Sequence, residues 1–299
     1  MKIVKYRKIY YLISGLLILA SITTLAVNGL KLGIDFTGGS LWEVRFPDGA
    51  PEQKAVEEKL GPLVTSLSVQ QGDDNTFLLR FQDIPEDKHQ EAKTVLGELG
   101  TVEELRFESI GPVIGEELKR KGIIAVGLGV LAVMFYIAYV FRRASRPVAS
   151  WQYGLITAMV ALFHDVFIPL GVFSLLGRLV GFEVSIPFIA ALLTVLGFSV
   201  HDTIVVFDRV RENVRRFAGE PFEDIVERSL RQTFFRSINT SLTLLFAVAA
   251  VWYFGGSMIR PFALTVMVGV ALGTYSSIFV ASTSLITVER WFAKRRRIR

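Results

Sequence analysis

The sequence of 299 residues contains no cysteine, and only 20% of its residues are charged. The absence of cysteine excludes disulfide bonds, thiolate catalysis and cysteine-ligated metal sites, and it leaves the compartment open. What dominates instead is apolar sequence, because 51% of the residues are hydrophobic. With a mean hydropathy of +0.45, this composition is typical of a membrane protein rather than of a soluble domain.

Six apolar runs are each long enough to cross a bilayer as a helix, which takes about 18 residues or more. We expect spans at residues 9–30, 122–141, 147–177, 184–206, 237–259 and 261–288. Two His-Asp pairs, His164 with Asp165 and His201 with Asp202, interrupt the third and fourth runs. The first run is too long for the apolar part of a signal peptide, so we interpret it as an uncleaved anchor.

Basic residues are distributed unevenly between these runs. Those of the N-terminus, of 142–146, of 209–236 and of the tail all fall on one side, whereas Arg178 and Arg260 are the only ones in the short loops on the other. Loops rich in Lys and Arg stay in the cytoplasm, so both termini are expected there. Attraction of these basic loops to the anionic membrane surface is then sufficient to explain the net charge of +5. Nucleic acid is not an expected partner.

The predicted organisation places one domain outside the membrane, between the first two spans. It consists of residues 1–30 (N-terminus and first span), 31–121 (extracytoplasmic domain), 122–289 (five further spans, with a cytoplasmic loop at 208–236) and 290–299 (basic tail). Alternation of apolar residues predicts strands at 40–46, 66–71, 76–81 and 102–110, and Glu- and Lys-rich segments predict helices at 51–60 and 85–99. The order βαββαβ is that of a ferredoxin-like α+β domain. His89 lies among helix charges, and we expect it at the solvated surface.

Two glycine-containing segments connect this domain to the membrane spans. In "GIDFTGGS", Asp35, Gly38 and Gly39 could suggest a phosphate loop, but no helix start and no Lys-Ser/Thr pair follow the glycines. A turn with unusual backbone angles is the favoured interpretation. In "ESIGPVIGEEL", Gly111 and Pro112 suit a bend. We therefore predict that these residues act as hinges that couple the outer domain to the spans.

Polar residues inside the predicted spans are the candidates for chemistry. A charged Asp in the apolar core costs about 2.5–3.5 kcal/mol on insertion scales, so Asp202 needs a reason to be there. A carboxyl that gains and loses a proton is a proton carrier, and movement of Arg236 toward or away from it would drive uptake and release. Arg236, Asn239 and Thr240 share one face of the predicted fifth span.

Each of these residues also has a simpler interpretation. Arg236 stands at the end of its span and can be a snorkelling positive charge. The two His-Asp pairs can join helices by hydrogen bonds, and Asn239 and Thr240 can bond backbone carbonyls. A metal site is not expected, because neighbouring residues on a helix diverge by about 100° and the sequence contains no H-E-x-x-H motif.

Five segments of the chain, taken together, resemble the SecD/SecF family of the resistance-nodulation-division superfamily, on the SecF side. They are "GIDFTGGS", "FESIGPVIGEEL", "ALFHDVFIPLG", "GFSVHDTIVVFDRVREN" and "RSINTSLTLL", in this order and spacing. The resemblance covers essentially the whole chain. It implies a non-enzymatic subunit of the bacterial inner membrane that pairs with SecD beside the SecYEG channel. Such subunits use the proton-motive force to help draw preproteins outward after the SecA ATPase has pushed them in.

The resemblance also implies roles for single residues. Asp202 and Arg236 match the residues implicated in proton movement, and the pair His164 and Asp165 falls on the third-span motif without an assigned step. H⁺ is the expected coupling ion, Na⁺ stays open, and no cofactor is expected. His201 stands where the family usually has Asn, and it either adds a titrating group or replaces an amide hydrogen bond. Ser237 stands where Thr is usual, and it keeps the hydroxyl group.

Two other functions are compatible with such a chain. A small-molecule or lipid exporter of the same superfamily would need larger outer domains than about 90 residues provide. A membrane scaffold without ion coupling would make no use of the Asp202 carboxyl. Substitution of Asp202 by Asn separates the ion-coupled function from the scaffold.

Overall fold

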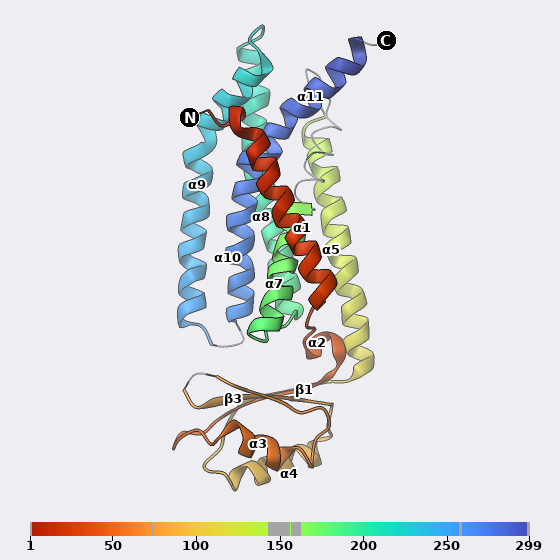
Figure 1. The fold of residues 1–299 in the computed structure, drawn as a ribbon, viewed down its shortest axis with the longest axis vertical. Coiled ribbons are helices and arrows are strands. Elements are labelled where there is room, and N and C mark those ends of the chain that lie inside the picture. Colours follow the sequence, from red (N-terminus) through yellow and green to blue (C-terminus); the bar gives the residue numbers. More distant parts are fainter. Residues whose placement is uncertain (1, 73, 143–155, 157–162, 257–258, 298–299) are drawn as a thin grey trace. The chain divides into compact units, whose positions relative to one another are not determined.

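The computed structural model describes residues 2–72, 74–142, 156, 163–256 and 259–297. The chain divides into two compact units, one formed by residues 32–123 and the other by the remainder. The larger unit is helical (Figure 1). Its elements are η1 (Val4–Tyr6), α1 (Arg7–Asn28), α5 (Pro112–Val140, which begins in the smaller unit), α7 (Phe167–Leu179), α8 (Ile186–Arg216), α9 (Phe222–Phe254), α10 (Arg260–Tyr275), the π-helical segment η2 (Ser276–Ala281) and α11 (Ser282–Arg297).

Five helices in the described part of the chain are long and apolar enough to cross a membrane. They are Val4–Asn28, Pro112–Val140, Ile186–Arg216, Phe222–Phe254 and the continuous helix Arg260–Lys294. Each of these helices overlaps one of the six predicted spans, and the predicted span 237–259 extends beyond the end of its helix at Phe254. Of the third predicted run, residues 147–155 and 157–162 lie outside the described residues, and its described end forms α7. The chain is thus a multi-pass helical membrane protein.

The segment 208–236, predicted as a loop, is almost entirely helical. Only residues 217–221 separate α8 from α9. Charged residues three positions apart support the helix, as between Arg209 Nη1 and Glu212 Oε2, which are 2.5 Å apart. The chain reverses at Gly219, whose φ of +104° suits glycine. Charge therefore indicates an aqueous environment for this segment, but not the absence of regular structure.

Both termini lie at the same end of the helical unit (Figure 1). Glu223, in the first turn of α9, contacts Arg7 of α1 at 3.2 Å and Arg290 of α11 at 2.5 Å. One turn later, Glu227 Oε2 accepts a hydrogen bond of 2.8 Å from the backbone N–H of Val4. These contacts tie α1, α9 and α11 together at one end of the helical unit.

The smaller unit is an α+β fold with one antiparallel sheet. Its elements are α2 (Ile34–Thr37), β1 (Gly39–Arg45), α3 (Gln53–Leu60), β2 (Ser68–Gln71), β3 (Thr76–Phe81), α4 (Glu86–Gly97) and β4 (Glu103–Ile110). The strands lie in the order β2-β3-β1-β4, and each adjacent pair is antiparallel. All four predicted strands and both predicted helices are therefore present. The additional short helix α2 was not predicted.

The core of this unit follows from alternation along the strands. Trp42 and Val44 of β1, and Phe77 and Leu79 of β3, are fully buried. They lie two residues apart on each strand, so they point to the same face of the sheet. Val56, Leu60, Ala92 and Leu96 of the two helices complete the cluster on that face. A shift of one residue in either strand would turn these side chains away from the helices.

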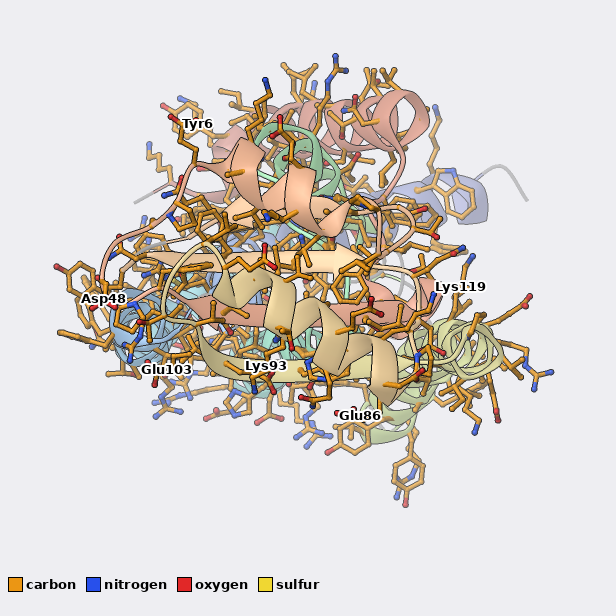
Figure 2. All side chains as sticks on the ribbon, turned by 90° about the horizontal axis from the view of Figure 1, so that it is seen from below. Tyr6, Asp48, Glu86, Lys93, Glu103 and Lys119 are labelled. Atoms are coloured by element: carbon orange, nitrogen blue, oxygen red, sulfur yellow. The ribbon has the colours of Figure 1, made fainter. Side chains whose placement is uncertain are left out.

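His89 does not lie at the surface as predicted. Its ring stacks on Phe107 with centroids 3.7 Å apart and meets Trp42 edge-on at 5.0 Å. Only 3% of the residue is exposed, whereas Glu86 and Lys93 of the same helix project outward (Figure 2). The flanking charges misled the prediction, because they occupy the solvated side of α4 while His89 occupies the side that faces the sheet.

The two predicted junctions contact each other. Gly38 and Gly39 have φ angles of +73° and +124°, which confirms the unusual turn. A Cβ atom on Gly38 would lie 2.7 Å from Cα of Pro112, the first residue of α5, and one on Gly115 would lie 2.7 Å from the backbone N of Gly38. Asp35 lies within α2, directly before this contact. The chain therefore enters and leaves the α+β unit through one close-packed joint.

Replacing Gly38 by alanine should destabilise this joint. Alanine is strained at this positive φ, and its Cβ would clash with Pro112. The two effects together should lower the stability of the folded state by roughly 1–3 kcal/mol or more. Gly111 is the matched control, because a Cβ there has no atom within 4 Å. Limited proteolysis of the full chain should cleave near the joint faster in Gly38→Ala than in Gly111→Ala. Equal cleavage of the two variants would contradict a close-packed joint.

Candidate functional site

Asp202 lies in the middle of α8 and is buried, with 2% of the residue exposed. Its carboxyl group lies among the hydroxyl groups of Ser237, Ser241 and Thr274. Among the described residues, however, its Oδ2 atom has no hydrogen-bond partner, and neither has Ser237 Oγ. A buried carboxylate with an unsatisfied oxygen is costly, whereas a proton or a small cation at that oxygen removes the cost.

Close packing of three helices creates this environment. A Cβ on Gly269 or Gly273 of α10 would lie within 2.8 Å of Val195 or Ser199 of α8, so the two helices meet at near backbone contact. Small residues at such positions are typical of closely packed membrane helices. Ser241 of α9 completes the group by a hydroxyl–hydroxyl hydrogen bond of 2.5 Å to Thr274.

The structure does not bring the other predicted residues of α9 to Asp202. Arg236 and Asn239 are exposed, and Thr240 donates a hydrogen bond of 2.9 Å to the Arg236 carbonyl. His201 is also exposed. The face of α9 that meets Asp202 carries Ser237 and Ser241, one residue further along. Arg236, Asn239 and Thr240 therefore share one face of α9, but in this structure that face is not the one that meets Asp202.

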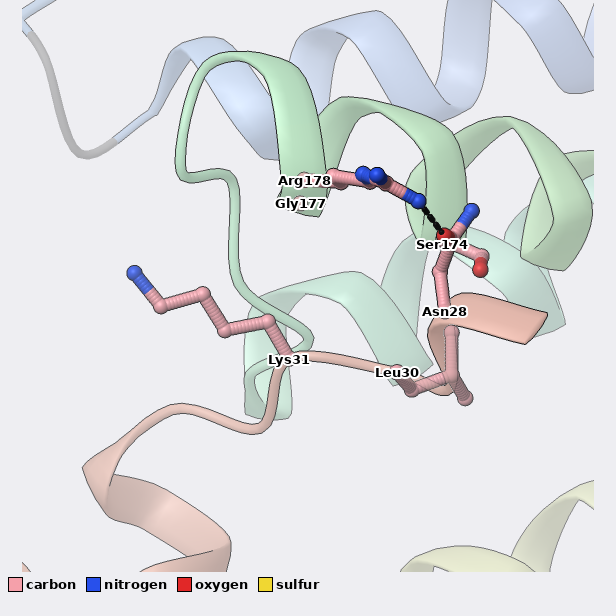
Figure 3. Close-up of a pocket in the computed structure, with 6 residues that line it drawn as sticks. All are labelled: Asn28, Leu30, Lys31, Ser174, Gly177 and Arg178. Atoms are coloured by element: carbon pink, nitrogen blue, oxygen red, sulfur yellow. Dashed lines mark hydrogen bonds between the residues drawn. The ribbon is translucent and has the colours of Figure 1, made fainter. Parts of the chain in front are cut away.

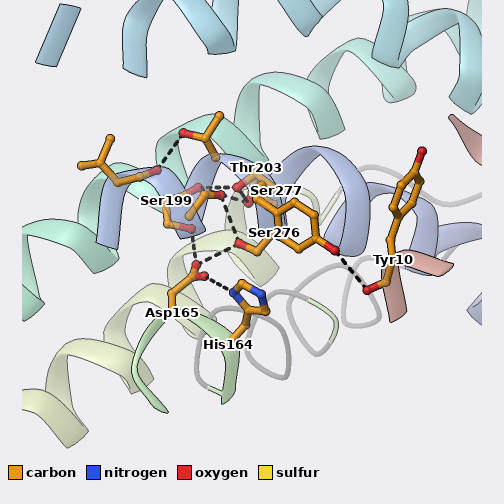
Figure 4. A network of polar contacts seen from close by, with 11 residues as sticks. Tyr10, His164, Asp165, Ser199, Thr203, Ser276 and Ser277 are labelled. Atoms are coloured by element: carbon orange, nitrogen blue, oxygen red, sulfur yellow. Dashed lines mark hydrogen bonds and ion pairs between the residues drawn. The ribbon is translucent and has the colours of Figure 1, made fainter. Parts of the chain in front are cut away.

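Asp165 is the centre of a second buried network (Figure 4). It has no exposed surface. Nδ1 of His164 donates to its Oδ1 at 2.9 Å, and its Oδ2 accepts from Ser276 at 3.1 Å and also from Ser199. Nε2 of His164 is buried and has no partner in the described residues. This carboxylate is thus saturated by donors from three helical segments, in contrast to Asp202.

The start of η2 connects the two carboxyl groups. Thr274 lies beside Asp202, Ser276 donates to Asp165, and Ser277 donates to the Ser199 carbonyl at 3.0 Å. Ser277 also lies 2.7 Å from the Thr203 hydroxyl. One stretch of four residues therefore touches both acids, and a π-helical turn begins within it. Such turns are frequent at functional sites.

The side-chain atoms of the two networks that could bind an ion are carboxyl and hydroxyl oxygens and one imidazole ring. No group of three or more His, Asp or Glu side chains that could hold a metal ion occurs in the residues the structure describes. Carboxyl and hydroxyl oxygens in an apolar bundle suit a proton or a small alkali cation. Sequence reasoning missed Ser199, Thr203, Ser241, Thr274 and Ser276, because single hydroxyl residues are ordinary in membrane helices.

Comparison with known sequence families is consistent with this architecture. Residues 91–291 match the family described as protein export membrane protein SecD/SecF, C-terminal, and residues 23–46 match the SecD/SecF GG motif. The second match includes Gly38 and Gly39 of the joint. The first includes both carboxyl groups described above.

Several curated proteins are similar over nearly their full length. Protein translocase subunit SecF of Thermobaculum terrenum is 41% identical, over 96% of this chain and 93% of the relative. That of Rhodothermus marinus is 40% identical, over 99% of this chain and 95% of the relative. Protein translocase subunit SecDF of Thermus thermophilus is 35% identical over 92% of this chain, which corresponds to 37% of that longer protein.

Solved structures of SecDF show the same fold. The crystal structure of the translocon-associated membrane protein SecDF from Thermus thermophilus matches with a TM-score of 0.84 and 32% identity, over 97% of this chain and 38% of that chain. A SecDF structure described as the super-membrane-facing form matches with a TM-score of 0.70 at the same identity, over 99% and 39% of the two chains.

Proposed function

Because this chain belongs to the SecD/SecF family of protein export membrane proteins and has the role of a SecF-type translocase subunit, translocation is the process that its buried polar groups serve. We propose that Asp202 couples this process to an ion gradient. The observation that carries the proposal is the buried carboxyl oxygen without a hydrogen-bond partner among the described residues. A proton bound there satisfies it, and its release recreates the unsatisfied state. Movement of one elementary charge across the membrane supplies about 2.3 kcal/mol per 100 mV.

The hydroxyl groups around Asp202 explain how both states persist. Ser237, Ser241 and Thr274 can each donate to a carboxylate or accept from a carboxylic acid. Rotation of a hydroxyl group therefore adapts the hydrogen bonds of the site to either state. H⁺ is the coupling ion in this proposal, and Na⁺ held by the same oxygens is the alternative that the experiment below distinguishes.

Arg236 acts in this proposal at the boundary with a partner rather than inside this chain. It lies on the exposed face of α9 together with Asn239. An Arg in a membrane span faces a bundle interior or a water-filled cavity, so a second helical unit has to cover this face. In SecDF relatives, SecF-like sequence occupies only part of a longer chain. We assign the rest of that longer chain, a SecD-type subunit, to this face.

The proposed topology has six spans, both termini in the cytoplasm and the α+β unit outside. The strand order β2-β3-β1-β4, with α3 after β1 and α4 after β3, is the arrangement expected for a ferredoxin-like domain. The membrane in question is the bacterial inner membrane. Preproteins, the SecYEG channel and SecA are the proposed further partners, and the subunit itself breaks no covalent bond.

In this proposal, motion of the membrane helices is transmitted to the α+β unit through the joint at Gly38 and Pro112. Because the two connections are packed together at this joint, motion of α5 is passed to the α+β unit there in this proposal. The hinge function predicted for Asp35, Gly39 and Gly111 is thus assigned to the joint as a whole. The prediction that exported chains are drawn outward depends on this motion.

The experiment is gradient-driven release of a preprotein from vesicles that contain this chain, a SecD-type subunit and the SecYEG channel. A pH gradient and a Na⁺ gradient are imposed separately. The proposal expects release to follow the pH gradient and to require Asp202. Stimulation by the Na⁺ gradient alone would show that the coupling ion is Na⁺ and not H⁺. If neither gradient stimulates release, the protein is a scaffold without ion coupling. Gradient-driven efflux of small molecules would indicate an exporter.

A further inference from the structure

The helical unit contains a pocket at the end that lies away from the two termini. It lies where α1 and α7 end, and its volume is about 440 Å³. Figure 3 shows its lining, which is formed by Asn28, Leu30, Lys31, Ser174, Gly177 and Arg178. None of these residues is acidic, and two are basic. The pocket shares no lining residue with the group around Asp202 and takes no part in the ion coupling proposed above.

The walls of this pocket are fixed by hydrogen bonds. Ser174 Oγ of α7 donates to the Gly29 carbonyl at 2.6 Å, just after α1 ends. The Lys31 carbonyl accepts a hydrogen bond of 2.8 Å from the backbone N–H of Val184. Gly177 permits the close approach of this segment, because a Cβ there would lie 3.3 Å from Cβ of Lys31. The pocket is therefore a built feature and not a gap between independent helices.

The polar groups of the pocket are mostly hydrogen-bond donors. Arg178 Nη1 donates to Asn28 Oδ1 at 2.7 Å, which orients the guanidinium group and uses the amide acceptor of Asn28 (Figure 3). The remaining guanidinium N–H groups and the Asn28 amide N–H groups are donors without partners in the described residues. Lys31 Nζ lies 3.3 Å from Glu183 Oε1, so these two charges offset each other. One net positive charge is left, on Arg178.

The position of the pocket restricts its ligand. Asn28 ends the first apolar span, so the pocket lies at the level of lipid headgroups. Arg178 is also one of two basic residues in the short loops predicted on this side, where basic residues are otherwise rare. We propose that this pocket binds the phosphate group of a monoanionic phosphate ester, supplied by an anionic phospholipid headgroup or by a soluble phosphate compound. A guanidinium fork with one net charge matches such a group.

Native mass spectrometry of the full chain tests the proposal, with phosphatidylglycerol and diacylglycerol, which has no phosphate group, as probes. We expect phosphatidylglycerol to bind about tenfold more tightly, as a charge-assisted hydrogen bond implies. Arg178→Gln should abolish that preference, and Asn28→Ala should weaken it a few-fold because the guanidinium loses its orientation. Arg260→Gln, at the other basic position predicted for this side, is the matched control and should keep the preference.

Addition of inorganic phosphate identifies the source of the group. Displacement of the lipid by millimolar phosphate in the wild-type chain, but not in Arg178→Gln, assigns the site to soluble phosphate. Retention of the lipid assigns it to the headgroup, and both results support the phosphate site. Equal binding of phosphatidylglycerol and diacylglycerol would overturn the proposal, because the phosphate group would then contribute nothing. Equal losses in Arg178→Gln and Arg260→Gln would also overturn it, because they show only general surface attraction.

Discussion

Replacement of Asp202 by asparagine should abolish gradient-stimulated preprotein release while the subunit still folds and assembles. Asparagine has nearly the shape of a protonated aspartic acid, and it can exchange hydrogen bonds with Ser237, Ser241 and Thr274. It cannot lose a proton in the physiological range. Because 2% of Asp202 is exposed, a neutral amide should be at least as stable there as the carboxylate.

The measurement compares the rate of release with and without an imposed pH gradient. In the wild type the gradient should accelerate release, and in Asp202→Asn the two rates should coincide. Co-purification with the SecD-type subunit and the thermal unfolding temperature should be unchanged. Asp208→Asn is the matched control, since this carboxyl group lies on the same helix, is exposed and contacts Arg211.

The contrary outcome is specific. If release by Asp202→Asn still accelerates under the gradient, the unsatisfied oxygen at Asp202 is not the ion site. If Asp208→Asn also loses the acceleration, the effect reports the charge of α8 as a whole. A loss of assembly in Asp202→Asn would show instead that the carboxylate holds the helices together.

Periodicity was sufficient to predict the elements of the α+β unit. Trp42 and Val44, like Phe77 and Leu79, repeat every second residue, and no other backbone state places such residues on one buried face. The same reasoning failed for His89, because a helix with charges on most sides does not reveal which single residue faces the sheet. The side of α4 that faces the sheet becomes visible only in the structure, where the His89 ring stacks on Phe107 of β4.

The candidate site was predicted in part. Asp202 and Asp165 could be identified because a carboxyl group inside an apolar run is rare. The residues around them could not, because Ser and Thr in a membrane helix usually bond their own backbone, as Thr240 does. The helix phase that brings Ser237 rather than Arg236 to Asp202 follows from the packing of α9 against α8 and α10. Helices α8 and α10 in turn approach each other closely at Gly269 and Gly273.

Asp165 should behave differently from Asp202, because its oxygens are already saturated with donors. Replacement by alanine leaves His164, Ser199 and Ser276 without their common acceptor in a fully buried position. Loss of one partner from a buried network costs about 3–5 kcal/mol. We expect Asp165→Ala to lower the apparent unfolding temperature of the detergent-solubilised chain by roughly ten degrees, whereas Asp208→Ala, at an exposed position, should change it little.

Asp165→Asn separates anchoring from ion transport. The asparagine carbonyl oxygen can accept from Ser199 and Ser276, and its amide group can donate to Nδ1 of His164 once the imidazole proton moves to Nε2. This variant should therefore keep most of the stability and, unlike Asp202→Asn, also keep gradient-stimulated release. Loss of the stimulation at full stability would place Asp165 on the ion path. The stretch Thr274–Ser277, which touches both acids, would then be the segment that carries the ion between them.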